Sequence, residues 1–275
     1  MAPKPANLSP TALSPTALTP TALSPRLGRR AWLRLAALLA GGLALGAGGA
    51  PAWAESPSEL LRRRLGACAP LADPLQELLR RNREFAALWQ RAAASGDPSQ
   101  RAALLLAQSP LRCQLGPEDL AQGQQPWAAL LCCADSRLAP EWLFAAGAGE
   151  LFQVRSAGNT AFPAGVASLE YAVAELQVPL ILVLGHSGCG AVRAALGDGP
   201  LTPLLEQLVL PIRQALPAGG GSGVQGLERA VQANARAAAA ALPQSSQLLA
   251  RAQAEGRLRI QPAYLDIASG LVSLL

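Results

Sequence analysis

Histidine is nearly absent from this sequence of 275 residues, because His186 is the only one. A metal site held by three imidazoles is therefore excluded. Two thiolates together with one imidazole are ligands that suit zinc. The chain has five cysteines from which the thiolates could come.

Acidic residues are missing from the first 54 positions, which hold five of the 23 basic residues. Subtracting those five leaves 18 basic residues against 18 acidic ones, so the remainder is formally neutral. The pI of about 9.3 thus reflects the N-terminal segment and not a polyanion-binding surface. We therefore expect no nucleic-acid partner. The five residues are Lys4, Arg26, Arg29, Arg30 and Arg34.

Apolar bulk is also scarce in residues 8–25, which repeat a unit of five residues. The unit is Leu-Ser-Pro-Thr-Ala twice, then Leu-Thr-Pro-Thr-Ala, then Leu-Ser-Pro. A proline in every unit blocks both helix and sheet, and the segment cannot form a core. We predict that it is disordered.

The glycine-rich run at residues 219–223 lacks the lysine and the preceding strand that a phosphate-binding loop requires. It is interpreted as a flexible connection. A nucleotide-binding function is not indicated by it.

Residues 29–54 have the parts of a secretory signal peptide: a basic start, an uncharged stretch from residue 35, and an Ala-Trp-Ala end at 52–54. The uncharged stretch is about long enough to span a membrane, so an uncleaved anchor is the alternative. Its glycines and Pro51 make it a poor helix. We expect cleavage after Ala54, with membrane contact only if the segment is retained, and one catalytic domain over residues 55–275.

Residues 28–34 resemble the twin-arginine export consensus, because Arg29 and Arg30 are followed by one residue, an apolar pair and a basic residue. This predicts export of the folded protein to the periplasm, or to the thylakoid lumen if the source is a photosynthetic bacterium. The alternative is that both arginines merely supply the basic region of an ordinary signal.

Strand and helix patterns alternate from Trp127 onward. This predicts an α/β fold with a central, mostly parallel sheet flanked by helices. Asp73-Pro74 and Asp97-Pro98 mark the starts of an N-terminal helical region. The expected alternating segments are 127–133, 139–145, 150–155, 163–177, 179–184 and 190 onward, followed by mostly helix after residue 201 and a terminal hairpin of 257–260 with 263–267.

Two polar motifs follow two of the predicted strands. Residues 133–137 read Cys-Ala-Asp-Ser-Arg, and residues 185–190 read Gly-His-Ser-Gly-Cys-Gly. Since the carboxyl ends of parallel strands meet at one edge of a sheet, Cys133, His186 and Cys189 could converge there. Three such ligands with a fourth position open are typical of a catalytic zinc site. The alternative is ordinary packing of small buried thiols and a core histidine.

Asp135 and Arg137 stand beside the first of these ligands. A zinc ion with two thiolates is formally neutral and acidifies water less than one held by histidines, so neighbouring groups must assist. Asp135 would accept a hydrogen bond from the attacking oxygen, and Arg137 would keep Asp135 ionised and oriented. A purely structural salt bridge is the alternative.

These motifs resemble the signatures of the β-class carbonic anhydrases. The resemblance extends from about residue 73 to the C-terminus and implies hydration of carbon dioxide to bicarbonate and a proton, one zinc ion per subunit, and a homodimer or higher homo-oligomer built through the N-terminal helices. The matching segments are 133–137 (C-x-D-S-R), 149–155 (G-E-x-F-x-x-R), 157–159 (A-x-N), 168–173 (S-x-E-Y-A-V) and 185–190 (G-H-x-x-C-G).

The same resemblance implies a substrate pocket. Gln124, in a G-Q-x-P segment, corresponds to a glutamine that donates to bicarbonate, while Phe152 and Tyr171 correspond to aromatic walls that often act across the subunit boundary. Gly190 completes the second signature beside the metal. Ordinary packing or a solvated loop is the alternative for Gln124 and the two aromatic residues. In part of the family the aspartate corresponding to Asp135 closes onto the zinc, and the sequence leaves that open.

Two other functions remain compatible with these residues. One is a related zinc hydrolase of carbon disulfide or carbonyl sulfide, and the other is a non-catalytic subunit stabilised by zinc. Among the remaining cysteines, Cys132 is expected in the core. Cys68 and Cys113 either pair in an oxidising compartment or stay as two free thiols.

Overall fold

The computed structural model of the protein describes residues 57–106, 115–216 and 223–275. The proline-rich repeat and the export signal predicted over residues 1–54 lie outside these ranges, as do Cys113 and most of the glycine-rich run. Within the described part of the chain, no helix is both long and apolar enough to cross a membrane.

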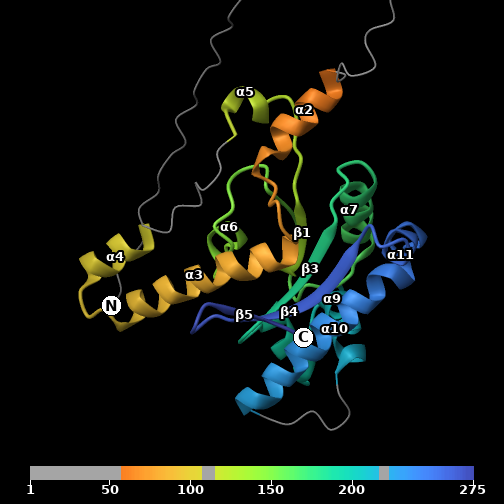
Figure 1. The fold of residues 1–275 in the computed structure, drawn as a ribbon. Helices are drawn as coiled ribbons and strands as arrows, with labels where there is room; N and C mark the ends of the chain where they lie inside the picture. Colours follow the sequence, from red (N-terminus) through yellow and green to blue (C-terminus); the bar gives the residue numbers. More distant parts are fainter. Residues whose placement is uncertain (1–56, 107–114, 217–222) are drawn as a thin grey trace, which may run out of the picture. The chain divides into compact units, whose positions relative to one another are not determined.

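A five-stranded sheet forms the centre of the domain, with the strand order β2-β1-β3-β4-β5 (Figure 1). The first four strands in this order pair in parallel, and only β5 runs antiparallel to its neighbour. The prediction of a mostly parallel α/β sheet is confirmed. The strands are β1 (Ala128–Cys133), β2 (Leu151–Ser156), β3 (Leu180–His186), β4 (Arg259–Asp266) and β5 (Leu271–Leu274).

Helices connect these strands and precede them. Asp73 caps α3 as predicted, because its carboxylate accepts a hydrogen bond from the backbone N–H of Gln76 at 3.0 Å. The described helices are α2 (Pro57–Leu65), η1 (Gly66–Cys68), α3 (Pro74–Ala94), α4 (Pro98–Leu106), α5 (Pro117–Leu120), α6 (Pro140–Leu143), α7 (Pro163–Ala174), α8 (Gly190–Leu196), α9 (Pro203–Ala215), α10 (Gly223–Ser245) and α11 (Gln247–Ala254).

Both faces of the sheet are covered, which explains why β1 and β3 are buried along their whole length. Leu130 and Leu182 belong to a core shared with α3, α8, α9 and the first part of α10. Leu131 and Val183, the next residues along each strand, belong to a second core shared with α7, α11 and the later part of α10. The alternation places successive side chains in opposite layers, as the pleat requires.

A buried ion pair fastens α3 to the start of the sheet. Arg81 donates to the carboxylate of Glu150 at 3.0 Å, and the indole N–H of Trp127 donates to the same oxygen at 3.0 Å. The guanidinium of Arg81 also lies over the ring of Trp127, 5.1 Å from its centroid. Both charged residues are almost completely buried, so Glu150 depends on Arg81 for charge compensation, while Arg81 also pairs with Glu77 at 2.6 Å.

The predicted terminal hairpin is wrong in its position. Segments 257–260 and 263–267 do not pair with each other: half of the first and most of the second lie in the single strand β4, and the hairpin is formed by β4 with β5. Pro262, inside β4, points its carbonyl toward β5, where it accepts from the N–H of Leu275 at the very end of the pairing. Its missing N–H therefore removes only a terminal ladder bond, which is why proline does not end the strand here.

Candidate active site

Three metal-binding side chains meet at the carboxyl edge of the sheet, as the two motifs predicted. Cys133 is the last residue of β1, His186 is the last residue of β3, and Cys189 is the N-cap of α8. Their possible ligand atoms lie within 4.8 Å of one another, and the two sulfur atoms are 4.0 Å apart. All three residues are buried.

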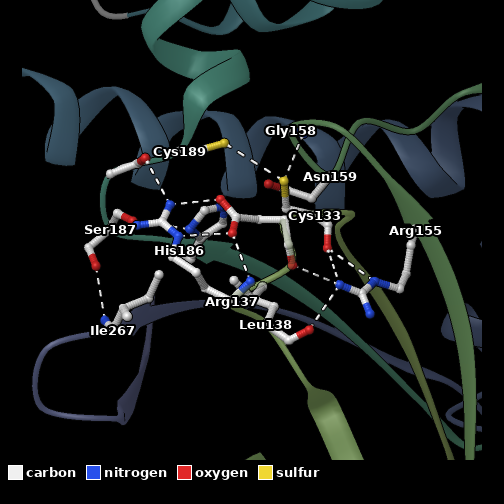
Figure 2. A network of polar contacts seen from close by, with 12 residues as sticks. Cys133, Arg137, Leu138, Arg155, Gly158, Asn159, His186, Ser187, Cys189 and Ile267 are labelled. Atoms are coloured by element: carbon white, nitrogen blue, oxygen red, sulfur yellow. Dashed lines mark hydrogen bonds and ion pairs between the residues drawn. The ribbon is translucent and has the colours of Figure 1, made fainter. Parts of the chain in front are cut away.

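The imidazole of His186 is fixed in the form that a metal needs. Its Nδ1 lies 3.0 Å from the backbone carbonyl of Ser187, and a carbonyl can only accept, so Nδ1 carries the proton. The Nε2 atom then presents a lone pair, and it is buried without a hydrogen-bond partner. Ser187 is itself held in place, because its hydroxyl accepts from the N–H of Ile267 at 2.9 Å (Figure 2). A buried, unpartnered lone pair beside two thiols fits a bound cation.

The two thiols are electrostatically coupled. The hydrogen bond between them lowers the pKa of Cys133 and raises that of Cys189. The backbone N–H of Gly158 also points at the Cys133 sulfur, at 3.3 Å, and stabilises its thiolate. Tetrahedral zinc with Zn–S bonds of about 2.3 Å places two sulfurs about 3.8 Å apart, close to the separation found. The donor set thus fits zinc, which would replace the shared proton.

The loop after β2 places the backbone N–H of Gly158 against the sulfur of Cys133. Gly158 adopts a positive φ of 82°, and a Cβ there would lie 2.6 Å from the side chain of Ile212. The amide of Asn234, on α10, donates to the Gly158 carbonyl at 2.7 Å and so holds the peptide that follows Gly158 in place. Only glycine satisfies both the backbone angle and the space.

Asp135 and Arg137 form a bidentate ion pair beside the metal ligands. Arg137 donates from Nε to Oδ1 at 2.9 Å and from Nη2 to Oδ2 at 2.7 Å, and its backbone N–H also reaches Oδ1. These hydrogen bonds hold the pKa of Asp135 well below its ordinary value, so the carboxylate stays ionised. Nη2 of Arg137 also reaches the carbonyl of Gly188 at 3.3 Å, which ties the two motifs together.

Arg155 supports the site in a way that the sequence did not predict. Its guanidinium donates to the backbone carbonyls of Cys133, Asp135 and Leu138 (Figure 2). The side chain of Arg155 therefore holds the turn that carries Cys133 and the Asp135–Arg137 pair through three backbone carbonyls. The G-E-x-F-x-x-R segment contains this arginine, but nothing in the segment shows which atoms it contacts.

The predicted pocket residues are not gathered around the metal ligands within one chain. Phe152 is registered with Ala129, four residues before Cys133, which is about 13 Å along the strand. Tyr171 packs against Phe152, with ring centroids 6.3 Å apart, and is 49% exposed. Gln124 is exposed and lies in the loop before β1. Because β1 runs from Ala128 to Cys133, this loop lies at the end of the sheet that is remote from the metal ligands.

Gly190 does lie at the metal ligands, as the first residue of α8 after Cys189. Apart from its chain neighbours and its own helix, no described residue places an atom within 4 Å of the position that a Cβ would occupy, so Gly190 leaves open space next to the ligand.

The remaining cysteines are divided between core and disulfide. Cys132 is completely buried, as expected, and is a free thiol together with Cys133 and Cys189. Cys68 is disulfide-bonded. The pairing considered for it involves Cys113, which lies outside the described residues.

Comparisons with known proteins agree with this geometry. A family model described as carbonic anhydrase matches residues 128–272. A carbonic anhydrase of Mycolicibacterium smegmatis is 35% identical over 179 residues, which cover 62% of this chain and 87% of that protein. Carbonic anhydrase 2 of Mycobacterium tuberculosis is 54% identical over 85 residues, 30% of this chain and 41% of that protein. Among solved structures, a tetrameric β-carbonic anhydrase of Sordaria macrospora aligns with a TM-score of 0.53 and 29% identity, over 57% of this chain and 84% of that one.

Proposed function

Because this chain belongs to the β-class carbonic anhydrase family, we propose that it catalyses the reversible hydration of carbon dioxide to bicarbonate and a proton, with one zinc ion per subunit. The observation that carries this proposal is the convergence of Cys133, His186 and Cys189 at one edge of the sheet. A carboxylate held ionised by Arg137 stands beside them. A purely structural zinc site would be closed by a fourth protein ligand.

Each residue of the site has a distinct task in this reaction. Cys133, His186 and Cys189 would hold the zinc ion, which would lower the pKa of a water molecule and so make hydroxide available near neutral pH. Asp135 accepts a hydrogen bond from the oxygen that attacks carbon dioxide and so directs a lone pair at the carbon. Arg137 keeps that carboxylate charged and aimed, and Arg155 fixes the turn from which both project. Gly190 leaves room beside the metal for the substrate.

The substrate pocket is completed by a second copy of the chain. The support for this is the position of Gln124, Phe152 and Tyr171, which lie toward the opposite end of the sheet from their own chain's metal ligands. Tyr171 is also half exposed, although a large aromatic residue usually gains by burial. In a homodimer whose two-fold axis brings opposite sheet ends together, these residues would line the partner's site, where Gln124 would donate to bicarbonate.

Hydrolysis of carbon disulfide or carbonyl sulfide would use the same ligand set and is the second candidate. Stopped-flow hydration of carbon dioxide, run beside sulfide-release assays with both sulfur compounds and a zinc determination, separates the candidates. Our proposal requires rapid hydration and about one zinc ion per chain. Rapid sulfide release without hydration would replace it with the second candidate, and zinc without either activity would indicate a structural subunit.

Export from the cytoplasm after folding is the further part of the proposal. It is supported by the Arg29–Arg30 pair ahead of a weakly hydrophobic, glycine-rich stretch. Folding with zinc already bound would also protect Cys133 and Cys189 from oxidation during transit. Replacing both arginines by lysine keeps the charge and removes the paired guanidinium groups. We expect the variant to remain in the cytoplasm with its signal uncleaved, and normal export and processing would contradict the twin-arginine interpretation.

A further inference from the structure

A small pocket with aromatic walls lies next to the catalytic ion pair. Its volume is about 220 Å³, and we call it the aromatic pocket. Its lining includes Phe85 and Trp89 from α3, Trp142 from α6, Ile267 after β4, and Arg137 itself. Apart from the arginine, none of these five residues has a role in the proposed reaction.

The walls of the aromatic pocket are already in place. The rings of Phe85 and Trp89 are stacked with centroids 5.6 Å apart. The indole N–H of Trp89 donates to the carbonyl of Ile267 at 3.1 Å, which fixes the orientation of that ring. Gly270 lets the turn after β4 approach closely, since a Cβ there would lie 3.0 Å from Phe85. Trp142 is 37% exposed and leaves one side of the pocket reachable from solvent.

Arg137 gives this apolar pocket a positive charge. Its side chain is 52% exposed, and its Nε and Nη2 atoms are engaged with Asp135 and Gly188. The Nη1 atom has no hydrogen-bond partner among the described residues. A guanidinium with free donors beside aromatic walls is complementary to a carboxylate attached to a flat ring. The volume is below the range of about 300–1,000 Å³ found for drug-sized ligands, which limits the fit to about one ring.

We propose that the aromatic pocket binds a small aromatic monocarboxylate that inhibits the enzyme from beside the metal. The carboxylate pairs with Arg137 in competition with Asp135, and the ring is held between Trp142 and the Phe85–Trp89 stack. Asp135 then loses the partner that aims it, so turnover falls while zinc stays bound. This regulation rests on the proposed function, but the binding step does not.

Benzoate is the probe, and calorimetry on the purified zinc-loaded protein is the primary measurement. Acetate carries the charge without the ring, and benzamide carries the ring without the charge, so both should bind at least about tenfold more weakly than benzoate. Azide, a small anion that binds directly to zinc, should not abolish benzoate binding. Equal binding of acetate and benzoate, or loss of benzoate binding with azide, would mean simple metal coordination and overturn the proposal.

Trp142→Ala removes one wall, and Leu204→Ala is the matched control, since Leu204 is an exposed apolar residue that does not line the pocket. Trp142→Ala should weaken benzoate binding and raise the inhibiting concentration about tenfold, the scale of one lost aromatic contact, with uninhibited turnover unchanged. Leu204→Ala should match the wild type. Unchanged benzoate affinity in Trp142→Ala, or no binding to the wild type because another chain covers the pocket, would overturn the proposal. Because calorimetry needs no turnover, a failure of the proposed hydration activity would be seen separately.

Discussion

The Oδ2 atom of Asp135 lies 3.9 Å from the Nε2 atom of His186, while both carboxylate oxygens accept hydrogen bonds from Arg137. The carboxylate therefore lies directly beside the metal ligands, and the guanidinium fixes its orientation there. In this position it would assist the oxygen that attacks carbon dioxide.

Asp135→Asn keeps the size of the side chain and removes its charge. The variant should retain zinc, because none of the three ligands is changed. The rate of hydration should fall by about 10²-fold or more, the scale expected for loss of an orienting or proton-accepting group. Stopped-flow rates with a metal determination on the same sample check this. Near-normal turnover would show that Asp135 is only structural.

Arg155→Gln tests the support of the ligand-bearing turn. The change removes the guanidinium that donates to three backbone carbonyls, so the side chains of Cys133 and Asp135 should both be positioned less precisely. We expect zinc affinity, measured by competition with a chelator, to fall by about 10- to 100-fold, as for other groups that orient metal ligands. Arg257→Gln is the control, since among the described residues the side chain of Arg257 pairs with its exposed neighbour Glu255 alone. Equal affinities in the two variants would contradict the role given to Arg155.

The buried pair of Arg81 and Glu150 should matter for stability and not for chemistry. Arg81→Met leaves Glu150 buried with the N–H groups of Trp127 and Gly147 as its hydrogen-bond donors. The free energy of unfolding should fall by about 3 kcal/mol, near the lower end of the range for breaking a buried ion pair. Breaking the exposed Arg257–Glu255 pair should cost less than about 1 kcal/mol. Denaturant unfolding of both variants measures the difference, and similar losses would contradict the argument.

The metal ligands were predictable because their positions depend on local patterns. A short apolar run followed by a polar motif places Cys133 and His186 at strand ends, and parallel strands bring such ends together. Arg155 and Arg81 were not predictable as contacts, because each reaches atoms that only the tertiary fold brings near. Glu150, for example, is 69 positions from Arg81.

The terminal hairpin shows a different kind of limit. The two segments 257–260 and 263–267 were expected as separate strands, and only the pairing of β4 with the short strand β5 shows that one strand continues through Pro262, whose missing N–H is dispensable there. The roles carried over to Gln124, Phe152 and Tyr171 stay predictions, because they depend on a second chain.

Subunit sharing can be tested by mixing two inactive variants. His186→Ala lacks a metal ligand, and Gln124→Ala lacks the proposed bicarbonate donor. If Gln124 acts in the partner's site, a mixed dimer contains one site with both residues intact. Random pairing then restores about a quarter of the wild-type sites, since half of the dimers are mixed and each has one complete site. Hydration rates of the co-expressed variants measure this, and activity no higher than the average of the two separate variants would contradict the sharing.

Hydration of carbon dioxide by wild-type protein and by His186→Ala, with zinc measured in both, tests the central claim most directly. The structure gives His186 one accessible function, because its Nδ1 is committed to Ser187 and its Nε2 faces the two thiols. We predict about one zinc ion per chain and rapid hydration in the wild type, and loss of most of the zinc with essentially all activity in the variant. Full zinc occupancy in His186→Ala, or a zinc-loaded wild type that does not hydrate carbon dioxide, would contradict the account.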